Sequence, residues 1–451
     1  MPARGRPPAV LVFGVMLGYR YPTLVPAARR RGLTVLGIDN LNPRNASIDA
    51  VRRRDPDHCL AGIAEVAWIP DHRGQDIGDR VAAWSRDHDI RAVLVLGEPY
   101  VDVAATMTDL LGLRGPGLRA SRVCRNKLLQ RRYLAAWSPP SRLVPAEARA
   151  AALTDWTTFP AVVKPIGRTA SSGVRQVHST EDLRAALDEY APIEPAVVEQ
   201  YVPGPELSVE SLVAGHTVVF AEITGKRTNE DDGVHCVETG HTTPDPRLTP
   251  AVRAAVLAAN AAVLDRLDFA DGAAHAEFRV SPRGTITLME VAARPAGDAI
   301  DTLYHLATGV PLVETLLAIL LGEPARHPGP YRHARQVYLP HAPGILRAVH
   351  ADGLGVPVSG LDNRPAWPAV TPLPAGAPPT VHYVLAGRVP GTRLQPVRES
   401  ADRSTMVILD APDAAGLDRL ERRCHETIRI EVVPDQPATL RQVATVTTEG
   451  G

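Results

Sequence analysis

The sequence contains very little lysine and little cysteine. Among its 49 basic residues only Lys127, Lys164 and Lys226 are lysine, and all the others are arginine. The four cysteines are scattered and form no C-x-x-C pair, which argues against a disulfide framework and against a zinc site. This cysteine usage fits a reducing compartment, so we expect a cytoplasmic location.

Long hydrophobic runs and an excess of one charge are also missing. No run approaches the roughly 20 apolar residues that a bilayer-spanning helix needs. The apolar start, residues 9–17, resembles a short signal peptide but lacks a small-residue cleavage pattern, so a buried first strand is the favoured interpretation. A formal net charge of -1 gives no general attraction to nucleic acid or to an anionic membrane, so we expect small-molecule partners.

The rest of the composition is that of a globular protein with several units. At 451 residues, 45% of them hydrophobic, the chain is too long for one core, and we expect three or four units. The three lysines are unusual against so much arginine. A phosphate site often needs a compact ammonium charge instead of a planar guanidinium, and such a site would retain lysine. Chance survival of the three lysines is the alternative.

The first 120 residues have the pattern of a doubly wound α/β unit. Apolar runs alternate with helical segments there, with strands predicted at residues 9–13, 34–38 and 92–96 and helices at 22–31 and 103–111. A nicotinamide site is the alternative for such a unit. The first turn, residues 14–18, lacks the G-x-G-x-x-G spacing, however, and the G-x-G-x-x-A match at 115–120 follows a predicted helix.

The following segments alternate as expected for an α+β unit. We predict helices and strands, with helices at 121–137, 181–190, 251–267 and 311–321 and strands at 161–164, 196–199, 207–213, 273–280 and 285–291. From about residue 333 the sequence becomes Pro-rich and strand-like, with a final helix near 413–427. This change predicts an appended C-terminal domain.

Two glutamates are predicted to face each other across a hairpin. If Arg283 and Gly284 form a two-residue loop, Glu277 lies opposite Glu290. At ~5 Å and an effective dielectric near 20 the two carboxylates repel by roughly 3 kcal/mol, so the pair favours a bound cation. Mg²⁺ commonly binds one or two carboxylates together with substrate phosphates. A different register, or an ion pair between Glu277 and Arg279, is the alternative.

A loop of small residues follows the strand that ends in Lys164. Its residues are Gly167, Arg168, Thr169, Ala170, Ser171, Ser172 and Gly173. Backbone N–H groups in such a loop can close over phosphate oxygens. The loop is not a P-loop, because the lysine precedes it and G-x-x-x-x-G-K-[ST] is absent. A plain flexible turn is the alternative.

The order of these motifs resembles the ATP-grasp superfamily over roughly residues 1–330. The matching residues follow one another as Lys127, Val163-Lys164-Pro165, the small-residue loop, Val198 to Val202, Gly204-Pro205-Glu206, Glu277 and Glu290. The resemblance implies that ATP is bound at Lys127, Lys164, Gly167, Ser171, Ser172, Gly173, Glu199, Gln200, Tyr201, Val202 and Glu206. It also implies that Glu277 and Glu290 bind Mg²⁺, with Mn²⁺ as an alternative.

Two further motifs are similar to the L-amino-acid (dipeptide) ligase branch of that superfamily. One is the run E-V-A-A-R-P-A-G at 290–297, and the other is E-T-G-H-T-T-P at 238–244. Many superfamily members have a metal-binding Asn at the place of Ala292, so the metal shell loses one expected ligand here. The similarity extends to the C-terminal domain, which that branch also carries.

The same resemblance implies roles for several residues beyond the nucleotide site. Arg294 would stabilise the oxyanion of a tetrahedral intermediate, and Gly297 would add a backbone N–H. Lys226 would be a further contact to phosphate or to an intermediate. Glu238 and His241, with Arg294, would bind the substrate.

We therefore predict an ATP-grasp fold that combines α/β and α+β parts. The expected parts are an N-terminal doubly wound α/β domain at 1–120, a Gly-rich lid subdomain at 121–200, a central catalytic subdomain at 201–330 and a C-terminal domain at 331–451. The implied activity is ATP-dependent activation of a carboxylate as an acyl phosphate and its ligation to an amine, with release of ADP and phosphate. Amino acids are the expected substrates.

Two alternatives to this function stay open. A ligase or carboxylase of the same superfamily could act on a purine precursor or on bicarbonate, and a non-catalytic module could bind ATP without turnover. Dimerisation is common among the proteins that the chain resembles, so a homodimer is one expectation.

Overall fold

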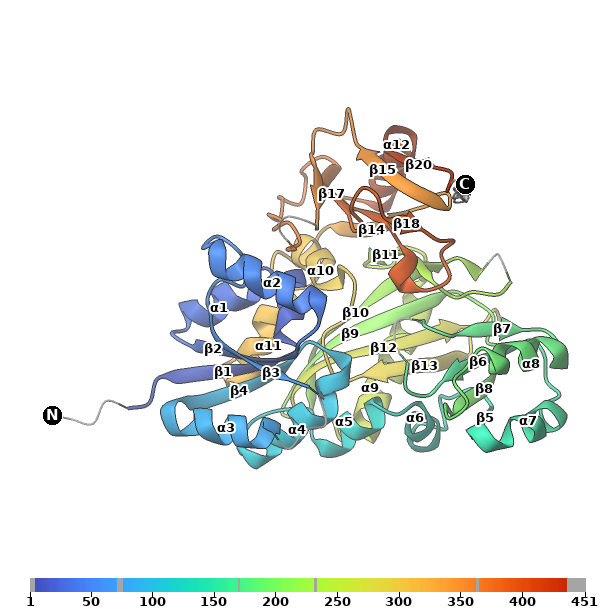
Figure 1. Cartoon of the computed structure of the whole chain (residues 1–451), viewed down its shortest axis with the longest axis horizontal. Coiled ribbons are helices and arrows are strands. Elements are labelled where there is room, and N and C mark those ends of the chain that lie inside the picture. Colours follow the sequence, from blue (N-terminus) through green and yellow to red (C-terminus); the bar gives the residue numbers. More distant parts are fainter. Residues whose placement is uncertain (1–4, 71–75, 169–170, 231–232, 362–364, 436–451) are drawn as a thin grey trace, which may run out of the picture.

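The computed structural model describes residues 5–70, 76–168, 171–230, 233–361 and 365–435. Figure 1 shows an N-terminal unit (blue), a small unit (green) and the C-terminal strands (orange) arranged around a long central sheet. The N-terminal sheet has the order β3-β2-β1-β4, and its strand pairs are parallel. Its strands are β1 (Pro8–Phe13), β2 (Thr34–Asn40), β3 (Ile63–Ile69) and β4 (Asp89–Val95).

Helices cover this sheet, so β1 is a continuous apolar run, as expected for a parallel strand buried on both faces. The helical segments are η1 (Val15–Arg20), α1 (Leu24–Arg30), α2 (Pro43–Arg54), α3 (Asp76–Asp87), η2 (Glu98–Tyr100) and α4 (Val101–Leu110). The doubly wound N-terminal unit predicted from the sequence is confirmed.

One predicted helix, at 121–137, is wrong, because the chain forms two short helices there. They are α5 (Leu118–Cys124) and α6 (Lys127–Tyr133). Asn126 starts the second helix, since its side chain accepts a hydrogen bond from the backbone N–H of Leu129 at 3.1 Å. This break places Lys127 in the first turn of α6.

The small unit is a four-stranded antiparallel sheet with helices on it. Its strand order is β5-β8-β6-β7, and its strands are β5 (Ser141–Val144), β6 (Ala161–Pro165), β7 (Arg175–Val177) and β8 (Ala196–Gln200). The helical segments are η3 (Ala146–Ala148), α7 (Arg149–Asp155) and α8 (Thr180–Asp188). A separate apolar core that includes Val163 and Val198 holds this unit together.

The central sheet continues without interruption into the C-terminal part of the chain. Its nine strands have the order β13-β12-β9-β10-β11-β14-β19-β17-β16, and β14 pairs antiparallel with β11. The strands are β9 (Glu206–Ala214), β10 (Thr217–Thr228), β11 (Glu238–Thr243), β12 (Gly272–Val280), β13 (Ile286–Ala292), β14 (His333–Leu339), β16 (Val358–Gly360), β17 (Thr380–Ala386) and β19 (Thr405–Ala411). The C-terminal part is therefore joined to the centre by backbone hydrogen bonds, and the domain limits at 120, 200 and 330 stay predictions.

A smaller sheet and one helix complete the C-terminal part. The sheet contains β15 (Gly344–His350), β18 (Arg393–Leu394) and β20 (Arg429–Val433), and α12 (Ala414–Thr427) packs on the strands of the central sheet. The short segment η5 (Ser400–Asp402) precedes β19.

Three further helices lie on the central sheet, namely α9 (Pro250–Arg266), α10 (Ile300–Thr308) and α11 (Leu312–Leu320). One apolar core runs from β1 through α10 and α11 to β17 and β19, and it fixes the N-terminal unit against the C-terminal strands. Within the described ranges no single helix has the length and apolarity to cross a membrane. The pair α10 and α11 meets that criterion only together, across a bend of 96°.

The hairpin of β12 and β13 has the predicted pairing at the two glutamates but a different turn. Glu277 is paired with Glu290, as predicted. Nearer the turn, Phe278 pairs with Leu288, because a bulge shifts the register by one residue. The predicted two-residue loop is wrong. The turn runs from Ser281 to Thr285, closed by a hydrogen bond from Ser281 N–H to the Thr285 carbonyl at 2.9 Å.

A buried ion pair in the C-terminal part gives a test of this fold. Arg332 and Asp410 are both fully buried, with Arg332 Nε 2.6 Å from Asp410 Oδ2. Removing the carboxylate in Asp410→Ala leaves a buried guanidinium without its counter-ion, so we expect a loss of about 3 to 5 kcal/mol in the free energy of unfolding, measured by urea denaturation.

The control variant is Asp89→Ala, which removes an exposed pair with Arg91. Exposed pairs contribute less than about 1 kcal/mol. Equal effects of the two variants would contradict the importance of the Arg332–Asp410 pair.

Candidate active site

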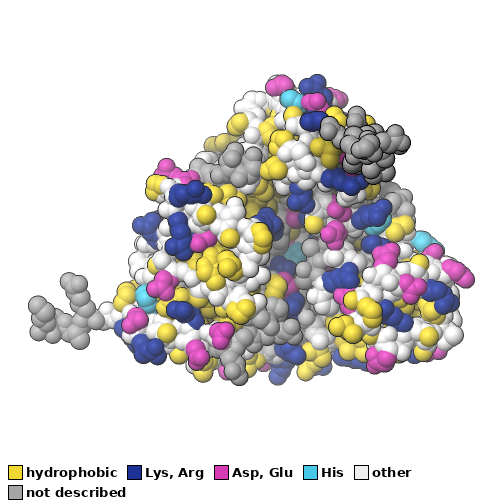
Figure 2. Space-filling view, viewed as in Figure 1, with side chains coloured by type: hydrophobic (Ala, Val, Ile, Leu, Met, Phe, Trp, Pro, Cys, Tyr) yellow, Lys and Arg dark blue, Asp and Glu magenta, His cyan; other side chains and the backbone are white. Residues whose placement is uncertain are grey.

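A cavity of about 640 Å³ lies where the N-terminal unit, the small unit and the C-terminal strands meet. Figure 2 shows the molecule hollowed at this place, with charged side chains inside the hollow. All three lysines of the sequence, Lys127, Lys164 and Lys226, line this one cavity. This arrangement argues against chance retention of the three lysines, because lysines retained by chance would not be expected to converge on one cavity.

Most of the residues predicted for the site line the cavity. These are Lys127, Lys164, Ser171, Ser172, Glu199, Gln200, Tyr201, Val202, Glu206, Lys226, Glu238, His241, Glu277, Glu290, Arg294 and Gly297. Two predicted loop residues, Gly167 and Gly173, are not part of the lining. Thr169 and Ala170, which complete the predicted loop, lie outside the described residues.

The side of the cavity formed by the small unit contains a buried charge cluster. Lys164 Nζ lies 2.6 Å from Glu199 Oε2, and Arg131 Nε donates to the same carboxylate at 2.5 Å. Burial alone would raise the pKa of Glu199, but the two cations outweigh it and lower the pKa to about 2. Burial lowers the pKa of Lys164, and Glu199 opposes that shift.

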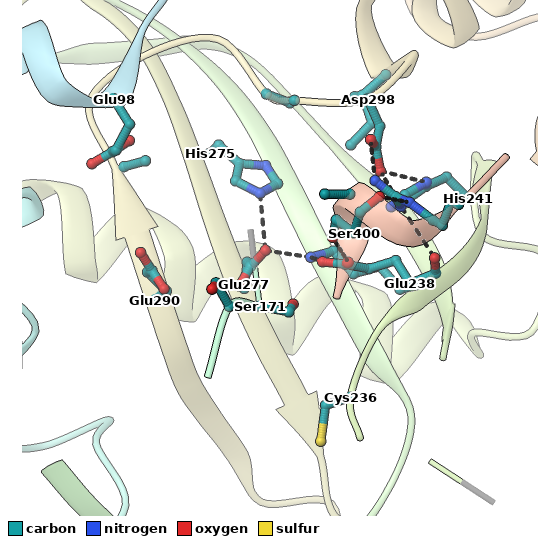
Figure 3. Close-up of a pocket in the computed structure, with 18 of the residues that line it drawn as sticks. Glu98, Ser171, Cys236, Glu238, His241, His275, Glu277, Glu290, Asp298 and Ser400 are labelled. Atoms are coloured by element: carbon teal, nitrogen blue, oxygen red, sulfur yellow. Dashed lines mark hydrogen bonds and ion pairs between the residues drawn. The ribbon is translucent and has the colours of Figure 1, made fainter. Parts of the chain in front are cut away.

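The first turn of α6 connects this side to the hairpin of the central sheet. Lys127 Nζ lies 3.3 Å from Glu290 Oε1 and donates to the carbonyl of Arg168 at 3.2 Å. The same ammonium group therefore reaches both the predicted metal ligand and the small-residue loop. Figure 3 shows Glu290 on the strand next to the one that carries Glu277.

Lys226 lies among three carboxylates on the central sheet. Its Nζ donates a hydrogen bond to Glu277, and it lies 3.5 Å from Glu206 Oε1 and 3.7 Å from Glu238 Oε1. Carboxylate oxygens of these three glutamates come within 4.8 Å of one another, close enough to share a cation. Burial opposes ionisation of Glu277, yet Lys226 and His275 hold its pKa well below the usual range.

His275 is a site residue that the sequence analysis did not identify. Its Nε2 lies 3.1 Å from Glu277 Oε1, and its Nδ1 lies 2.9 Å from Glu210. Although burial lowers it, these two carboxylates raise the pKa of His275 to about 9. The strand alternation could have found this residue, because His275, Glu277 and Arg279 occupy every second position of β12.

Arg279 does not pair with Glu277, so that alternative for the glutamate is wrong. Its guanidinium lies 2.9 Å from Glu206 Oε2 and also contacts Glu230.

Arg294 is held by a glutamate from the N-terminal unit. Its Nε donates to Glu98 Oε2, and Arg125 Nη1 donates to Glu98 Oε1 at 3.0 Å. Arg294 lies just beyond the end of β13 at Ala292, so it is not on the strand that carries Glu290. Glu98 directly follows β4 and Gly97, at the carboxyl end of a parallel strand, which is a position where α/β sheets commonly bind ligands.

The C-terminal strands contribute a second polar cluster. Asp298 accepts hydrogen bonds from Arg403 Nη2 at 2.8 Å and from Tyr338 Oη at 2.9 Å. Ser400 Oγ donates to Glu238 Oε2 at 3.2 Å, so this predicted substrate-binding residue touches the C-terminal part (Figure 3). Neither Asp298 nor Arg403 stands in a motif that local sequence could have identified.

His241 is buried between this cluster and the sheet. Its Nδ1 lies 3.2 Å from Gln336 Oε1 and 3.8 Å from Asp298 Oδ2. Burial lowers the pKa of His241 to about 4, and the attraction of Asp298 offsets this only in part. The imidazole is therefore neutral at pH 7 and has a nitrogen lone pair that can accept a hydrogen bond.

The chemistry of the lining fits a nucleotide and a divalent cation. Lys127 and Lys164 offer ammonium donors of the kind that bind phosphate, and Ser171 and Ser172 offer hydroxyl and backbone donors beside them. Glu277 and Glu290 offer oxygen ligands from neighbouring strands, the type that Mg²⁺ prefers. Both carboxylates are paired with lysine, so a metal ion would compete with these ammonium groups.

Comparison with known families identifies the fold. The sequence model of the ATP-grasp domain family matches residues 157–302 of this chain. The structure superposes on an L-amino acid ligase from Bacillus licheniformis with a TM-score of 0.72, at 20% identity, covering 95% of this chain and 100% of that one. It also resembles the biotin carboxylase domain of a 2-oxoglutarate carboxylase from Hydrogenobacter thermophilus, in complex with MgADP, with a TM-score of 0.63, 15% identity and 95% and 92% coverage.

Several curated proteins are similar in sequence, and three of them are described here. An uncharacterised protein, y4rH, of Sinorhizobium fredii is 25% identical over 93% of this chain and 87% of its own length. D-alanine–D-alanine ligase of Aquifex aeolicus is 31% identical over 33% of this chain and 51% of its length. Phosphoribosylamine–glycine ligase of Streptomyces coelicolor is 27% identical over 70% of this chain and 79% of its length.

The low pKa of His241 predicts a specific pH dependence of stability. In the unfolded chain a histidine has a pKa near 6.5, so below that pH the unfolded state binds the proton first and the folded state loses stability. Between pH 7 and pH 5 this residue should remove about 2 kcal/mol from the free energy of unfolding.

The variant His241→Gln should lack this part of the pH dependence, as measured by denaturant unfolding at the two pH values. Comparison of the NMR spectra of the two proteins assigns the histidine signal, which should titrate near pH 4. A midpoint near 6.5 would show that the side chain is solvated and would exclude the effect.

Proposed function

We propose that this chain, an ATP-grasp protein by its domain and its fold, is an ATP-dependent ligase that joins the carboxylate of an amino acid to an amine. One observation carries the proposal. The single cavity contains phosphate-type lysines, a facing pair of glutamates and, on another part of its wall, a polar cluster suited to an ammonium group and a carboxylate. Each of these groups serves a different part of the same ligation.

The nucleotide would be held by residues of the small unit and the adjoining strands. Lys127 and Lys164 would bind the phosphates of ATP, with Ser171 and Ser172 covering them. The segment from Glu199 to Val202 would contact the adenine, and Glu206 the ribose. Arg131 and Lys164 both pair with Glu199, so this segment has a fixed position before the nucleotide binds.

Glu277 and Glu290 would hold Mg²⁺, or Mn²⁺ in its place. The ion would neutralise negative charge on the phosphoryl group during its transfer. Of the lysines beside these glutamates, Lys127 is the one that also contacts the small-residue loop. It can therefore turn from Glu290 to a phosphate when a metal ion takes over the carboxylate.

The amino acid would bind with its ammonium group at Glu238, His241 and Asp298. His241 is neutral at pH 7 and accepts a hydrogen bond, and the carboxylates supply negative charge. Arg294 would bind the reacting carboxyl group and stabilise the oxyanion after attack by the amine, with Gly297 adding a backbone N–H. Glu98 orients the Arg294 guanidinium and is a positioning residue.

The names of the similar ligases support an amino-acid substrate. D-alanine–D-alanine ligase, phosphoribosylamine–glycine ligase and L-amino acid ligase each have an amino acid in the name. A second candidate is ligation of glycine to phosphoribosylamine, which is favoured by the similarity to the Streptomyces coelicolor enzyme over most of both chains. A cytoplasmic location and a homodimer remain proposals from the sequence.

The activity is tested with a matrix of amino acids, singly and in pairs, together with ATP and Mg²⁺. We expect ADP and phosphate release that depends on a particular pair, and a product lighter than the two substrates by one water, detected by mass spectrometry. Phosphoribosylamine with glycine is included as an acceptor pair for the second candidate. Binding of ATP without release of ADP for any pair would contradict the ligase and favour a non-catalytic module.

The role of Arg294 is tested with Arg294→Lys, which keeps the charge and removes the planar fork. Loss of one oxyanion donor costs about 10²- to 10³-fold in kcat, and the Kd for ATP should stay within about twofold because Arg294 does not contact the nucleotide side. Arg119→Ala, which removes an exposed pair with Asp268, is the control. Unchanged kcat in Arg294→Lys would assign the oxyanion to another group.

A further inference from the structure

One part of the cavity wall has no role in the function proposed above. It is formed by Tyr19 and Arg20 of η1, Arg44 in the first turn of α2 and Trp367. We refer to these four residues as the arginine–aromatic cluster. It belongs to the N-terminal unit except for Trp367, which comes from the C-terminal part of the chain.

The two arginines of this cluster lack carboxylate partners. Most cationic side chains on the cavity wall have a carboxylate within 4 Å; these are Lys127, Lys164, Arg168, Lys226, Arg279, Arg294 and Arg403. Within the described ranges Arg20 and Arg44 have none, and Arg388, the remaining one, donates to the carbonyl of Ala401. Among the described residues, the two guanidinium groups therefore have no carboxylate in direct contact, and the Asp298 carboxylate attracts Arg20 only from a longer distance.

The cluster is built so that the guanidinium groups are held in place. Arg20 Nε donates to Tyr19 Oη at 3.0 Å, and Arg44 Nη2 donates to the same oxygen. The guanidinium carbon of Arg20 lies 5.5 Å from the centres of both the Tyr19 and the Trp367 rings, and that of Arg44 lies 5.2 Å from the Tyr19 ring. Such stacking helps to hold both guanidinium groups in place and leaves the terminal N–H donors of Arg20 unused.

The free donors of Arg20 are available to a ligand. Among the described residues, its two terminal nitrogens make no hydrogen bond, because Nε is the only donor in use. The fork of an arginine matches the two oxygens of a carboxylate or phosphate. Arg44, at the N-terminal end of α2, adds its charge where the helix dipole also favours an anion.

A buried aspartate ties the two supporting elements together. Asp39, at the end of β2, accepts hydrogen bonds from Met16 N–H of η1 at 2.8 Å and from Asn45 Nδ2 of α2 at 3.0 Å. The segments that carry Arg20 and Arg44 are therefore positioned by the same side chain, and the cluster is organised before a ligand binds.

We propose that Arg20 and Arg44 form an anion-binding subsite for the amine substrate, which therefore carries a carboxylate or a phosphate in addition to its amine. The subsite adjoins the reaction centre, because Tyr21 Oη donates to the carbonyl of Ala296 at 2.7 Å, between Arg294 and Gly297. The acid substrate needs its own carboxylate at Arg294, so a second anion belongs to the amine. This assignment to the amine rests on the ligase function proposed above.

Anion binding is tested first, without any turnover. The wild-type protein is saturated with Mg²⁺ and AMP-PNP, which occupy the nucleotide site, and is titrated by calorimetry with inorganic phosphate and separately with acetate. We expect one site for at least one probe, with a Kd raised at least about tenfold in Arg20→Gln/Arg44→Gln, the effect of losing a charged hydrogen bond.

Controls separate the subsite from a general effect of charge. Arg347→Gln removes an exposed arginine outside the cavity and should leave the Kd unchanged. Arg20→Lys keeps the charge without the fork and should recover part of the affinity. Lack of binding of both probes to the wild type, or an equal Kd in the double variant, would overturn the proposal.

The second arm uses the acid–amine pair found in the matrix and varies only the amine. The amine is supplied as the amino acid, as its carboxamide and as the matching aminoalkylphosphonate. We expect the carboxamide to have a KM at least about tenfold above that of the better anion, with little change in kcat, and the arginine variants to remove the difference. The better anion identifies carboxylate or phosphate as the natural group.

A carboxamide with the same KM as the carboxylate and the phosphonate would overturn the proposal that the subsite binds the amine substrate. If no pair is turned over, the ligase function fails, and the phosphate and acetate titrations still decide whether Arg20 and Arg44 bind an anion. The two failures are thus distinguishable.

Discussion

The structure of the cavity depends on the compensation of buried carboxylates by lysine and arginine. Glu277 and Glu290 face each other on adjacent strands, where two bare carboxylates would repel each other strongly. Lys226 and His275 neutralise the first, and Lys127 neutralises the second. Lys226 comes from β10, His275 from the hairpin itself and Lys127 from α6. These three elements can therefore approach one another only if all the pairs form together. The charges of the site are thus also part of what holds its walls together.

The continuity of the central sheet explains how the C-terminal part can belong to the site. Hydrogen bonds between β11 and β14 carry the sheet into residues that follow β11 by about a hundred positions in the chain. The same strands carry Tyr338, and Arg403 precedes β19. Both side chains bind Asp298, so the substrate side of the cavity is closed by residues that could not be supplied by a loosely attached domain.

The sequence predicted most of the elements that lie near the nucleotide side, because their signals are local. Apolar runs located β1, β8 and β12, and the hairpin motif placed Glu277 opposite Glu290. Contacts between distant segments were not predictable. The pair of Glu98 with Arg294 joins residues 196 positions apart, and the β11–β14 pairing leaves no local pattern. The break before α6 depended on one cap, Asn126, which competes poorly with a long helical pattern when only periodicity is considered.

The presence of lysine at position 226, in a chain that otherwise uses arginine, has a physical explanation in the geometry around it. Its ammonium group contacts Glu277 and lies within 4 Å of Glu206 and Glu238, and oxygens of the three carboxylates lie within 4.8 Å of one another. A compact charge with three rotatable donors can serve three carboxylates at such spacing, whereas the donors of a guanidinium all lie in one plane. Arg279 illustrates the contrast on the next site of β12, since it reaches Glu206 and Glu230 from one side. An arginine in place of Lys226 would therefore conflict with the geometry of this cluster.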